Sequence, residues 1–424
     1  MFHTRTKKRR SHATQGDILS DLPRDVIHEI CERLPLRDAA RMSVLSHKWL
    51  DIWTSTPHLA FDYEFFCSVL KGEAQETLKF GSIVSKILFQ HEGPIHKFSL
   101  SVPPLKSCPD VAQWISYLSR NGLREFRLSK MDDPRLKLNL RLFSCCDLEK
   151  LKDLIGKSPL LQNLVLTNFN GMEERHIAID APNLRHLNID WLFESLDVKS
   201  CENLVSVSVG WQRWQVKADR DDDRKIHKAS LCNVVEVLAN SSKLERLCLR
   251  GHFCKVLFKA GGLQYTFEKL KSLELLIYSD DLPFVVNCIQ SFPNIETLKI
   301  TVLTCTNLPE HVLDYNPDTT LHHLSYAKVE IVSASSTELK VIEFLLACSP
   351  VLEKLYVHPR FHDDEASKLI RMLMQSNRLR RASRMVEVIW PENLLPKISV
   401  QVATSSSSTS GSSSESFEES SDSE

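Results

Sequence analysis

Few side chains in this sequence are spaced as catalytic chemistry requires. Gly156-Lys157-Ser158 ends like a phosphate-binding loop, but Leu151 stands where that loop needs its first glycine, and Pro159 follows at once. The 16 histidines include no His-Glu-x-x-His pair, and both the Gly-x-Ser-x-Gly elbow and the Gly-x-Gly-x-x-Gly turn are missing from the sequence. We therefore expect a protein that binds other molecules, is not an enzyme and carries no cofactor.

The cysteines and the net charge exclude further classes of site. Twelve cysteines are scattered without a Cys-x-x-Cys pair or a His/Cys cluster at zinc spacing, which indicates reduced, mostly buried thiols and no metal. A net charge of −1 argues against nucleic acid or an anionic membrane as the main partner. No run approaches 18 apolar residues, and no apolar stretch follows the basic N-terminus, so neither a membrane span nor a secretory signal is expected. The expected location is the nucleus, the cytoplasm or both.

The first element expected is a short helix near the N-terminus. Pro23 suits the first turn of a helix, where its missing N–H costs nothing, and Ser20 and Asp21 precede it as capping candidates. Pro35 disfavours helical geometry at the residue before it, so the helix should end there. Between the two prolines, apolar residues recur at helical spacing. They are Ile27, Ile30, Cys31 and Leu34.

Two more short helices are expected in the next 20 residues or so. One runs through residues 38–45, and the other carries Trp49, Ile52 and Trp53 on one face. Three helices in roughly 37 residues cannot bury this much apolar surface among themselves. The segment should therefore dock onto a partner, or else serve as a helical cap on the domain that follows it.

Beyond residue 90 the spacing L-x-x-L-x-L recurs ten times, with other large apolar residues allowed, at separations of 20 to 40 residues. The occurrences are Ile95-Phe98-Leu100, Leu123-Phe126-Leu128, Leu161-Leu164-Leu166, Leu184-Leu187-Ile189, Leu204-Val207-Val209, Leu244-Leu247-Leu249, Leu270-Leu273-Leu275, Ile295-Leu298-Ile300, Leu321-Leu324-Tyr326 and Leu352-Leu355-Val357. This series resembles a leucine-rich repeat array, which stacks into a curved solenoid with a parallel sheet inside. The predicted fold class is thus α/β, with a short all-helical segment before the solenoid.

The residues that alternate with the inward apolar positions should project onto the concave face of the sheet. Their charges are mixed, which favours a protein target over nucleic acid. The candidates for target contact are Arg127, His186, Asp190, Arg246, Arg250, Lys354 and Tyr356. His322-His323 is expected inside a repeat strand, with the two side chains on opposite faces and His323 on the concave one.

The longest gap in the repeat series contains the charged run 219–225, which no core could accept, so an exposed loop is expected there. Trp191, Trp211 and Trp214 lie just past neighbouring strands. Tryptophans in that place either anchor a partner at an exposed edge or plug the end of a core.

The two ends are predicted to be disordered. Residues 1–16 carry a short basic run, which is either a nuclear localisation signal or a solvated leader. From Thr404 onward there are twelve serines and five acidic residues, and Phe417 is the only large apolar group. Three of those serines precede a carboxylate by three residues, a pattern that suits acid-directed kinases. They are Ser412, Ser416 and Ser421.

Residues 17–53 resemble an F-box, a helical hook that docks onto the Skp-family adaptor of a cullin ubiquitin ligase. The likeness includes both Leu-Pro pairs, Leu22-Pro23 and Leu34-Pro35, and the tryptophans Trp49 and Trp53. Further stretches resemble the plant F-box/FBD/leucine-rich repeat proteins. They are residues 36–41, 57–62, 91–101, 142–148 and, for part of the FBD segment, 345–355.

The resemblance implies a substrate receptor of an SCF ubiquitin ligase, bound through the adaptor to a cullin, with an unknown protein substrate on the repeats. No RING-type zinc site is expected, so catalysis would be borrowed from partners. The implied adaptor contacts are Ile18, Leu22, Pro23, Val26, Ile27, Ile30, Leu34, Pro35, Val44, Leu45, Trp49 and Trp53. The expected domains are a leader (1–16), an F-box (17–60), a connector (61–90), repeats (91–340), an FBD-like cap (341–395) and a Ser-rich acidic tail (396–424).

Two other functions stay open at this point. One is a free-standing interaction scaffold whose F-box is vestigial or structural, and which would retain no adaptor. The other is an enzyme with a non-standard site on the concave face, for which the sequence offers no catalytic constellation.

Overall fold

The computed structural model describes residues 19, 21–70, 76–102, 110–130, 148–167, 176–190, 193, 195–199, 202–211, 234–235, 237–259, 263, 265–303, 319–360 and 366–391. The chain forms two compact units, residues 1–201 and 202–424, and each is described by itself.

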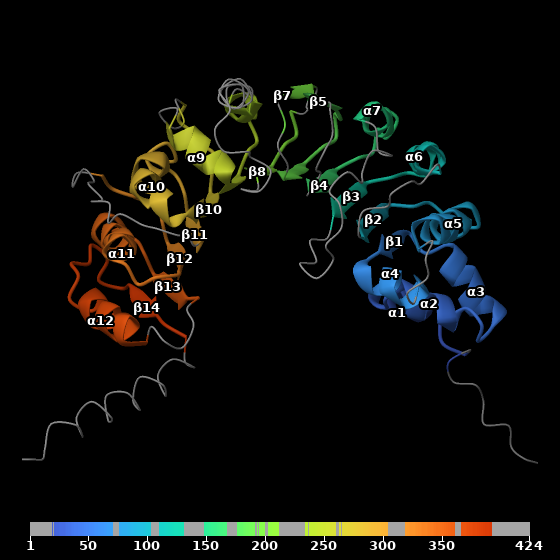
Figure 1. Ribbon diagram of the computed structural model, residues 1–424, viewed down its shortest axis with the longest axis horizontal. Coiled ribbons are helices and arrows are strands. Elements are labelled where there is room, and N and C mark those ends of the chain that lie inside the picture. Colours follow the sequence, from blue (N-terminus) through green and yellow to red (C-terminus); the bar gives the residue numbers. More distant parts are fainter. Residues whose placement is uncertain are drawn as a thin grey trace, which may run out of the picture. The chain divides into compact units, whose positions relative to one another are not determined.

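The first unit begins with three short helices and continues as strands that alternate mostly with helices (Figure 1). Its elements are α1 (Arg24–Arg33), α2 (Leu36–Met42), α3 (His47–Thr54), β1 (His58–Phe61), α4 (Tyr63–Leu70), α5 (Glu76–Phe89), β2 (Lys97–Val102), α6 (Val111–Arg120), β3 (Glu125–Lys130), α7 (Leu148–Gly156), β4 (Asn163–Thr167), β5 (His176–Asp180), β6 (His186–Asp190) and β7 (Ser195–Lys199). Strands β1, β2, β3, β4 and β6 pair in that order, all parallel. Strands β5 and β7 form a separate parallel pair.

The second unit is a parallel sheet with the order β8-β9-β10-β11-β12-β13-β14. Its elements are β8 (Ser206–Trp211), β9 (Arg246–Gly251), α9 (His252–Lys259), β10 (Ser272–Tyr278), the 3-10 turn η2 (Ser279–Asp281), α10 (Leu282–Ile289), β11 (Thr297–Leu303), β12 (Tyr326–Ile331), α11 (Ser336–Cys348), β13 (Lys354–Pro359), α12 (Ala366–Ser376) and β14 (Glu387–Ile389). The predicted fold class, N-terminal helices followed by a long parallel sheet of repeats, is therefore confirmed.

The inward positions of the repeats form continuous apolar columns. Leu273 on β10 pairs in register with Leu298 on β11, and Leu275 pairs with Ile300. All four side chains are at most 1% exposed. Figure 1 shows α5, α6 and α7 along one face of the strands of the first unit, and α9, α10 and α11 along one face of the strands of the second. Because side chains alternate along a strand, the residues between these apolar positions lie on the opposite face, which we call the open face.

The backbone adds a second repeating contact between the strands. The carbonyl oxygen of Lys271 accepts hydrogen bonds from the N–H groups of Glu296 and Thr297, at 2.8 and 3.0 Å. The carbonyl oxygen of Glu296 in turn accepts from Ser325 and Tyr326. A parallel stack can thus continue from one repeat to the next without a break in the backbone pairing.

The predicted repeat at Leu321-Leu324-Tyr326 is wrong by three residues. Strand β12 places Ala327 opposite Leu298 and Val329 opposite Ile300, so these two residues fill the apolar columns. The physical reason is that Ala327 fills the column although alanine is not one of the large apolar residues of the spacing, and the array takes the register that aligns with β11. His322-His323 consequently lies in the exposed turn before β12, and not in a strand or on the open face.

Strands also occur where the sequence was not read as a repeat. Strand β1 pairs with β2, so the sheet starts at residue 58, and α4 and α5 occupy most of the segment 61–90 that was expected as a connector. Ring contacts join the two parts, because Phe61 of β1 contacts Phe65 of α4 and Phe80 of α5 edge to face. The pair β5–β7 was not predicted either.

Candidate interaction surfaces

The three N-terminal helices enclose a small core of their own. Ile27 and Cys31 of α1 pack with Trp49 and Ile52 of α3, all at most 3% exposed. The Trp49 indole Nε1 donates a hydrogen bond to the carbonyl oxygen of Leu19 at 3.1 Å. The core therefore uses the helical stripes predicted from the sequence and also ties down the segment that precedes α1.

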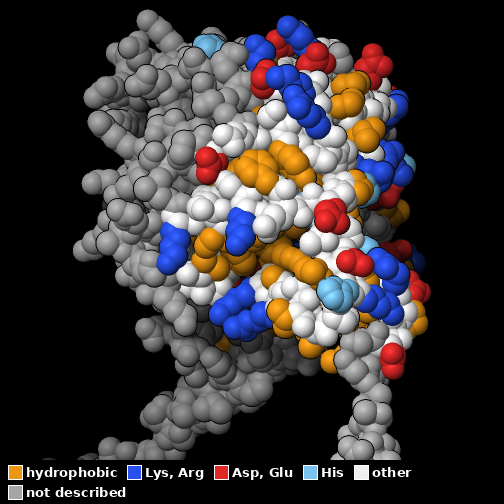
Figure 2. All heavy atoms as spheres, turned by 90° about the vertical axis from the view of Figure 1, so that its right-hand side faces the viewer, with side chains coloured by type: hydrophobic (Ala, Val, Ile, Leu, Met, Phe, Trp, Pro, Cys, Tyr) orange, Lys and Arg blue, Asp and Glu red, His pale blue; other side chains and the backbone are white. Residues whose placement is uncertain are grey.

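Large apolar side chains remain exposed around that core. Val44 is 83% exposed, and Leu19, Val26, Leu45 and Leu50 are between 38% and 45% exposed. Figure 2 shows the side of the molecule on the right of Figure 1, where apolar side chains gather in bands between charged ones. These exposed residues make an apolar surface that the helices themselves leave uncovered.

The predicted adaptor contacts divide between the core and this surface. Ile27 and Trp49 are fully buried and act through the core. The exposed members are Pro23, Val26, Pro35, Val44 and Leu45, and the half-buried ones are Leu22, Ile30, Leu34 and Trp53. Ile18 lies outside the described residues. Leu19 and Leu50 share the exposed apolar surface but were not among the predicted contacts, although Leu50 is visible in the sequence as an apolar residue off the Trp49–Ile52–Trp53 stripe.

Within the first unit, a tight loop fastens the end of α3 to the first strands. The Glu92 N–H donates a hydrogen bond to the Thr54 carbonyl oxygen at 2.8 Å. The N–H groups of His96 and Lys97 both donate to the carbonyl oxygen of Pro57. Gly93 fits against Ser55 so closely that a Cβ atom there would lie 3.0 Å from the Ser55 carbonyl oxygen. The three helices are therefore fixed to the sheet of this unit by main-chain contacts.

His91 opens the same loop and is 7% exposed. Burial lowers the pKa of its imidazole, and a backbone hydrogen bond with Pro94 opposes that shift. Its main-chain carbonyl oxygen accepts from the Tyr117 hydroxyl at 2.9 Å. The loop thus holds a histidine that is neutral in the folded protein over a wider pH range than in the unfolded chain.

The open face of the first unit carries one small charge cluster. Glu125 lies 3.1 Å from Lys97 Nζ and 3.7 Å from the Arg127 guanidinium. Arg127 is exposed and His186 is half-buried, so both can be reached from solvent. Asp190 alternates with the buried Leu187 and Ile189 as His186 does, but it is only 5% exposed, so it is not accessible from solvent in this structure.

The open face of the second unit holds the remaining predicted contacts, but it does not bring them all together. Arg246 is exposed and Arg250 half-buried, both on β9. Lys354 and Tyr356 lie on β13, four strands away in the order of the sheet, or about 19 Å. Tyr356 and Tyr326 approach each other with ring centroids 5.4 Å apart and a tilt of 36°. The face therefore offers an arginine pair at one end and an aromatic pair at the other.

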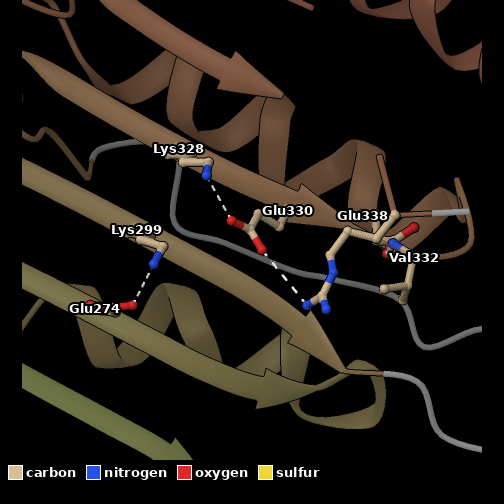
Figure 3. A network of polar contacts seen from close by, with 7 residues as sticks. Glu274, Lys299, Lys328, Glu330, Val332 and Glu338 are labelled. Atoms are coloured by element: carbon tan, nitrogen blue, oxygen red, sulfur yellow. Dashed lines mark hydrogen bonds and ion pairs between the residues drawn. The ribbon is translucent and has the colours of Figure 1, made fainter. Parts of the chain in front are cut away.

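A ladder of ion pairs lies between these two ends (Figure 3). Lys299 Nζ is 2.6 Å from Glu274 Oε1, and this hydrogen bond raises the pKa of Lys299 against the opposing effect of burial. Glu330 lies 2.7 Å from Lys328 Nζ and 3.8 Å from Arg360. Burial alone would raise the pKa of Glu330, but Lys328, Lys299 and Arg360 together lower it. Most charge in the middle of the face is thus compensated.

Just beyond β12, the chain turns around a buried carboxylate (Figure 3). Glu338 is 0% exposed and accepts hydrogen bonds from the N–H groups of Val332 and Ser335, at 2.8 and 2.9 Å. The Ser335 hydroxyl caps α11, so the two residues form a capping box. Ala334, directly before Ser335, takes a positive φ of 48°. The sequence reasoning missed this clamp, although Ser335-x-x-Glu338 before an apolar run was a visible signal.

The tryptophan at the end of β8 belongs to the core. Trp211 is 1% exposed and packs edge to face on Phe253 with ring centroids 5.0 Å apart. Its main chain runs beside Gly251, where a Cβ atom would lie 2.5 Å from the Trp211 carbonyl oxygen. Trp211 therefore fills the end of the core and does not anchor a partner at an exposed edge. Trp191 and Trp214 lie outside the described residues, as does the charged run 219–225.

The part of the chain that the structure describes contains no group of three or more His, Cys, Asp or Glu side chains that could hold a metal ion. Within the same residues no helix is long and apolar enough to cross a membrane. Of the six described free cysteines, four are buried, namely Cys31, Cys254, Cys288 and Cys348. Burial raises the pKa of the Cys288 thiol to about 12, which makes it unreactive as a nucleophile near neutral pH.

Comparison with known proteins finds similarity in both the N-terminal helices and the repeats. The F-box domain model matches residues 19–59, and a model described as FBD-associated F-box protein At5g56370, LRR repeats, matches residues 134–300. The F-box/FBD/LRR-repeat protein At1g13570 of Arabidopsis thaliana is 29% identical, over 88% of this chain and 98% of the relative. The chain is thus similar to an F-box/FBD/LRR-repeat protein over most of its length. The resemblance stated from the sequence is thereby confirmed.

Two further proteins are similar to this chain over most of their length as well. The Arabidopsis thaliana proteins At2g04230 and At5g53840, both described as F-box/FBD/LRR-repeat proteins, are 24% and 22% identical. The alignments cover 70% and 84% of this chain, and 76% and 91% of the two relatives. The N-terminal helices are accordingly called the F-box from here on, and the strands the repeats.

Proposed function

We propose that this protein is the substrate-recognition subunit of an SCF-type cullin ubiquitin ligase. The F-box docks onto a Skp-family adaptor, and the open face of the repeats binds a protein target for ubiquitination. The observation that carries the proposal is the F-box itself, which closes a core of four side chains and still leaves Val44 and its apolar neighbours in solvent.

Exposed apolar side chains gathered in one small helical segment favour a protein partner. Their burial against an adaptor would contribute roughly 1.5–3 kcal/mol for each large side chain. The fixed join between α3 and the first strands supports the same function. A rigid F-box holds the nearby repeats at a constant position relative to the adaptor, and through it to the cullin.

The repeats suit the second half of this function. Their open face carries cations, anions, tyrosines and hydroxyl groups in mixed order, which favours hydrogen-bonded recognition of a protein over binding to a polyanion. In this proposal the chain supplies binding alone, and the ligase chemistry belongs to partner subunits.

The adaptor contact is tested by changing Leu22 and Pro23 together to alanine in the full-length protein. Leu22 is half-buried beside the F-box core and Pro23 is exposed at the start of α1. The loss of both should weaken adaptor binding by about a hundredfold or more, so the variant should no longer co-purify with the adaptor. If the adaptor is retained undiminished, or if the wild-type protein retains none, the scaffold with a vestigial F-box becomes the better account.

The target contact is tested at Arg246 and Arg250, two guanidiniums on one strand of the open face. Changing both to glutamate should preserve the fold and the adaptor contact, and it should stabilise the cellular target against turnover. The matched control is the same change of charge, lysine to glutamate, at Lys243 and Lys269, which are exposed in turns. If the target is still degraded at the normal rate in the arginine variant, recognition lies elsewhere on the repeats.

A further inference from the structure

The C-terminal part of the second unit concentrates positive charge. We define the basic cap as residues 366–391, which comprise α12, the turns that follow it and β14. Within these 26 residues Glu387 is the only acidic side chain. The basic side chains are Lys368, Arg371, Arg378, Arg380, Arg381 and Arg384. A chain with a net charge of −1 thus carries a cap with a net charge of +5, from six cations and one anion.

All five arginines of the cap are exposed. Arg381 donates a hydrogen bond to the carbonyl oxygen of Val386 at 3.4 Å, but among the described residues none of the five forms an ion pair. The segment is held in place by its backbone, since the Ala382 N–H donates to the Leu346 carbonyl oxygen of α11 at 2.8 Å. The acidic run 363–365 before α12 lies outside the described residues. Repulsion among like charges makes such a cluster costly unless an anion neutralises it.

The cap also exposes two methionines among its arginines. Met374 is 56% exposed and Met385 is 82% exposed. Methionine is a flexible, polarisable side chain that packs well against aromatic rings. The exposed arginines of the cap therefore favour a strongly acidic partner, and its two methionines favour one that carries an aromatic side chain.

The rest of this chain contains a segment with that composition. The tail, residues 404–424, has five acidic residues, no basic residue and twelve serines, and its one large apolar side chain is Phe417. Glu415, Glu418 and Glu419 surround that phenylalanine. We propose that the basic cap is the docking site of the protein's own acidic tail.

The covalent connection makes this docking feasible at low intrinsic affinity. Glu415 follows Pro391, the last described residue, by 24 positions, and an extended chain of that length reaches about 80 Å. Helix α12 has 11 residues and is therefore only about 16 Å long. A tethered segment of this kind acts at an effective concentration on the order of millimolar.

Phosphorylation of the tail strengthens the contact in this proposal. Ser412, Ser416 and Ser421 each precede a carboxylate by three residues, and each phosphate would add about −1.5 to −2 charge near neutral pH. Arginine pairs with phosphate through two parallel hydrogen bonds, which a lysine cannot form. Five arginines and one lysine in the cap match that preference.

The open face of the repeats is a weaker site for the tail. Its central lysines already have carboxylate partners, because Lys299 pairs with Glu274 and Lys328 with Glu330. Docking of the tail there would have to break these ion pairs. The five arginines of the cap form no ion pair among the described residues, so they can bind a carboxylate or phosphate without that cost. The two basic surfaces of the second unit therefore have separate roles.

The test places a photo-cross-linker in the tail of the full-length protein. In a variant with Phe417 replaced by p-benzoylphenylalanine, irradiation should join the tail to Met374 or Met385, since benzophenone reacts readily with methionine. The yield should fall in 1 M salt, and it should rise when the tail is phosphorylated by an acid-directed kinase. The triple change Arg378→Glu, Arg380→Glu and Arg384→Glu should lower the yield about tenfold or more.

The matched control reverses three exposed lysines of the same unit, Lys243, Lys269 and Lys271, and should leave the yield unchanged. Circular dichroism and the unfolding temperature of both triple variants show whether the fold is retained. Cross-links to the open-face strands, cross-links between two copies, or an unchanged yield in the arginine variant would each overturn the proposal. Binding of an added oligonucleotide to the cap, without any cross-link from the tail, would do the same and assign the cap to nucleic acid.

Discussion

The F-box and the repeats treat their apolar side chains in opposite ways. The F-box packs three buried residues around Trp49, namely Ile27, Cys31 and Ile52, and leaves Val44 83% exposed. In the repeats, Leu298 and Ile300 are fully buried by neighbouring strands and helices, while Lys299 between them faces solvent. The F-box is a small fold that leaves apolar side chains exposed to solvent. In the repeats, each unit buries the apolar side chains of its neighbour.

The difference separates two kinds of partner. The exposed apolar surface of the F-box has a fixed shape and suits a single partner with a matching apolar surface. The free energy gained there depends on the apolar area removed from water. A polar face on stacked strands can change charge and hydrogen bonding without any change in the core. The same molecule can thus keep one contact constant while the other is free to vary among relatives.

The largest expected effect comes from a change in the F-box core. Trp49→Ala removes a fully buried indole and its hydrogen bond to Leu19, which should cost about 3–5 kcal/mol. Because the four residues of the F-box core come from α1 and α3 alone, amide hydrogen exchange should increase in residues 24–54 and remain slow in the strands of the second unit. Equal loss of protection in β10 and β11 would break the comparison, since it would make the F-box and repeats one cooperative core.

Two adjacent residues of β11 test the same contrast inside the repeats. Leu298→Ala should destabilise the second unit by about 2–5 kcal/mol, because the apolar column leaves no room for collapse. Lys299→Ala should change the free energy of unfolding by at most about 1 kcal/mol, since the Lys299–Glu274 pair is about 40% exposed on both sides. Denaturant unfolding of the two variants gives both numbers. Similar values for the two would contradict the assignment of opposite faces.

The buried carboxylate of Glu338 sharpens the comparison, because it is a polar group that the repeats do bury. Glu338→Ala leaves the N–H groups of Val332 and Ser335 without their acceptor, and this should cost about 1–3 kcal/mol. The measurement is the denaturation midpoint together with exchange rates of the amides in residues 332–335. Unchanged rates there would show that the turn holds its shape without the clamp.

The smallest expected effect is a pH dependence at the join between the two regions. The pKa of His91 is lowered in the folded state, so between that value and its ordinary value near 6.5 the unfolded chain binds more protons. Stability should therefore be full above about pH 6.5 and decrease as the pH falls below it. In His91→Asn this part of the pH dependence should disappear from thermal unfolding curves. A variant that keeps the full dependence would place its origin in other groups.

Much of this architecture could be predicted because it follows from periodicity. The spacing of Ile27 and Cys31 predicts the buried face of α1, and nine of the ten predicted repeat units have their inward positions where the spacing places them. The tenth failed at Ala327, because alanine is too small to register as an apolar anchor although it fills the same column.

The rest could not be predicted because it depends on contacts between distant segments. Strand β1 follows directly on the F-box, and only its pairing with β2 identifies it as part of the sheet. The burial of Asp190 and the isolation of Val44 likewise depend on what the surrounding elements cover. Exposure of the predicted adaptor residues is therefore information that the structure adds to the motif.

The central claim is that the exposed apolar surface of the F-box binds a Skp-family adaptor. The most direct measurement is the affinity of the full-length protein for the purified adaptor by titration calorimetry, for the wild type and for Val44→Glu. Val44 lies outside the F-box core, so the variant should keep its helicity and lose about tenfold to a hundredfold in affinity. Wild-type binding that is unchanged in Val44→Glu, or absent in both proteins, would contradict the account.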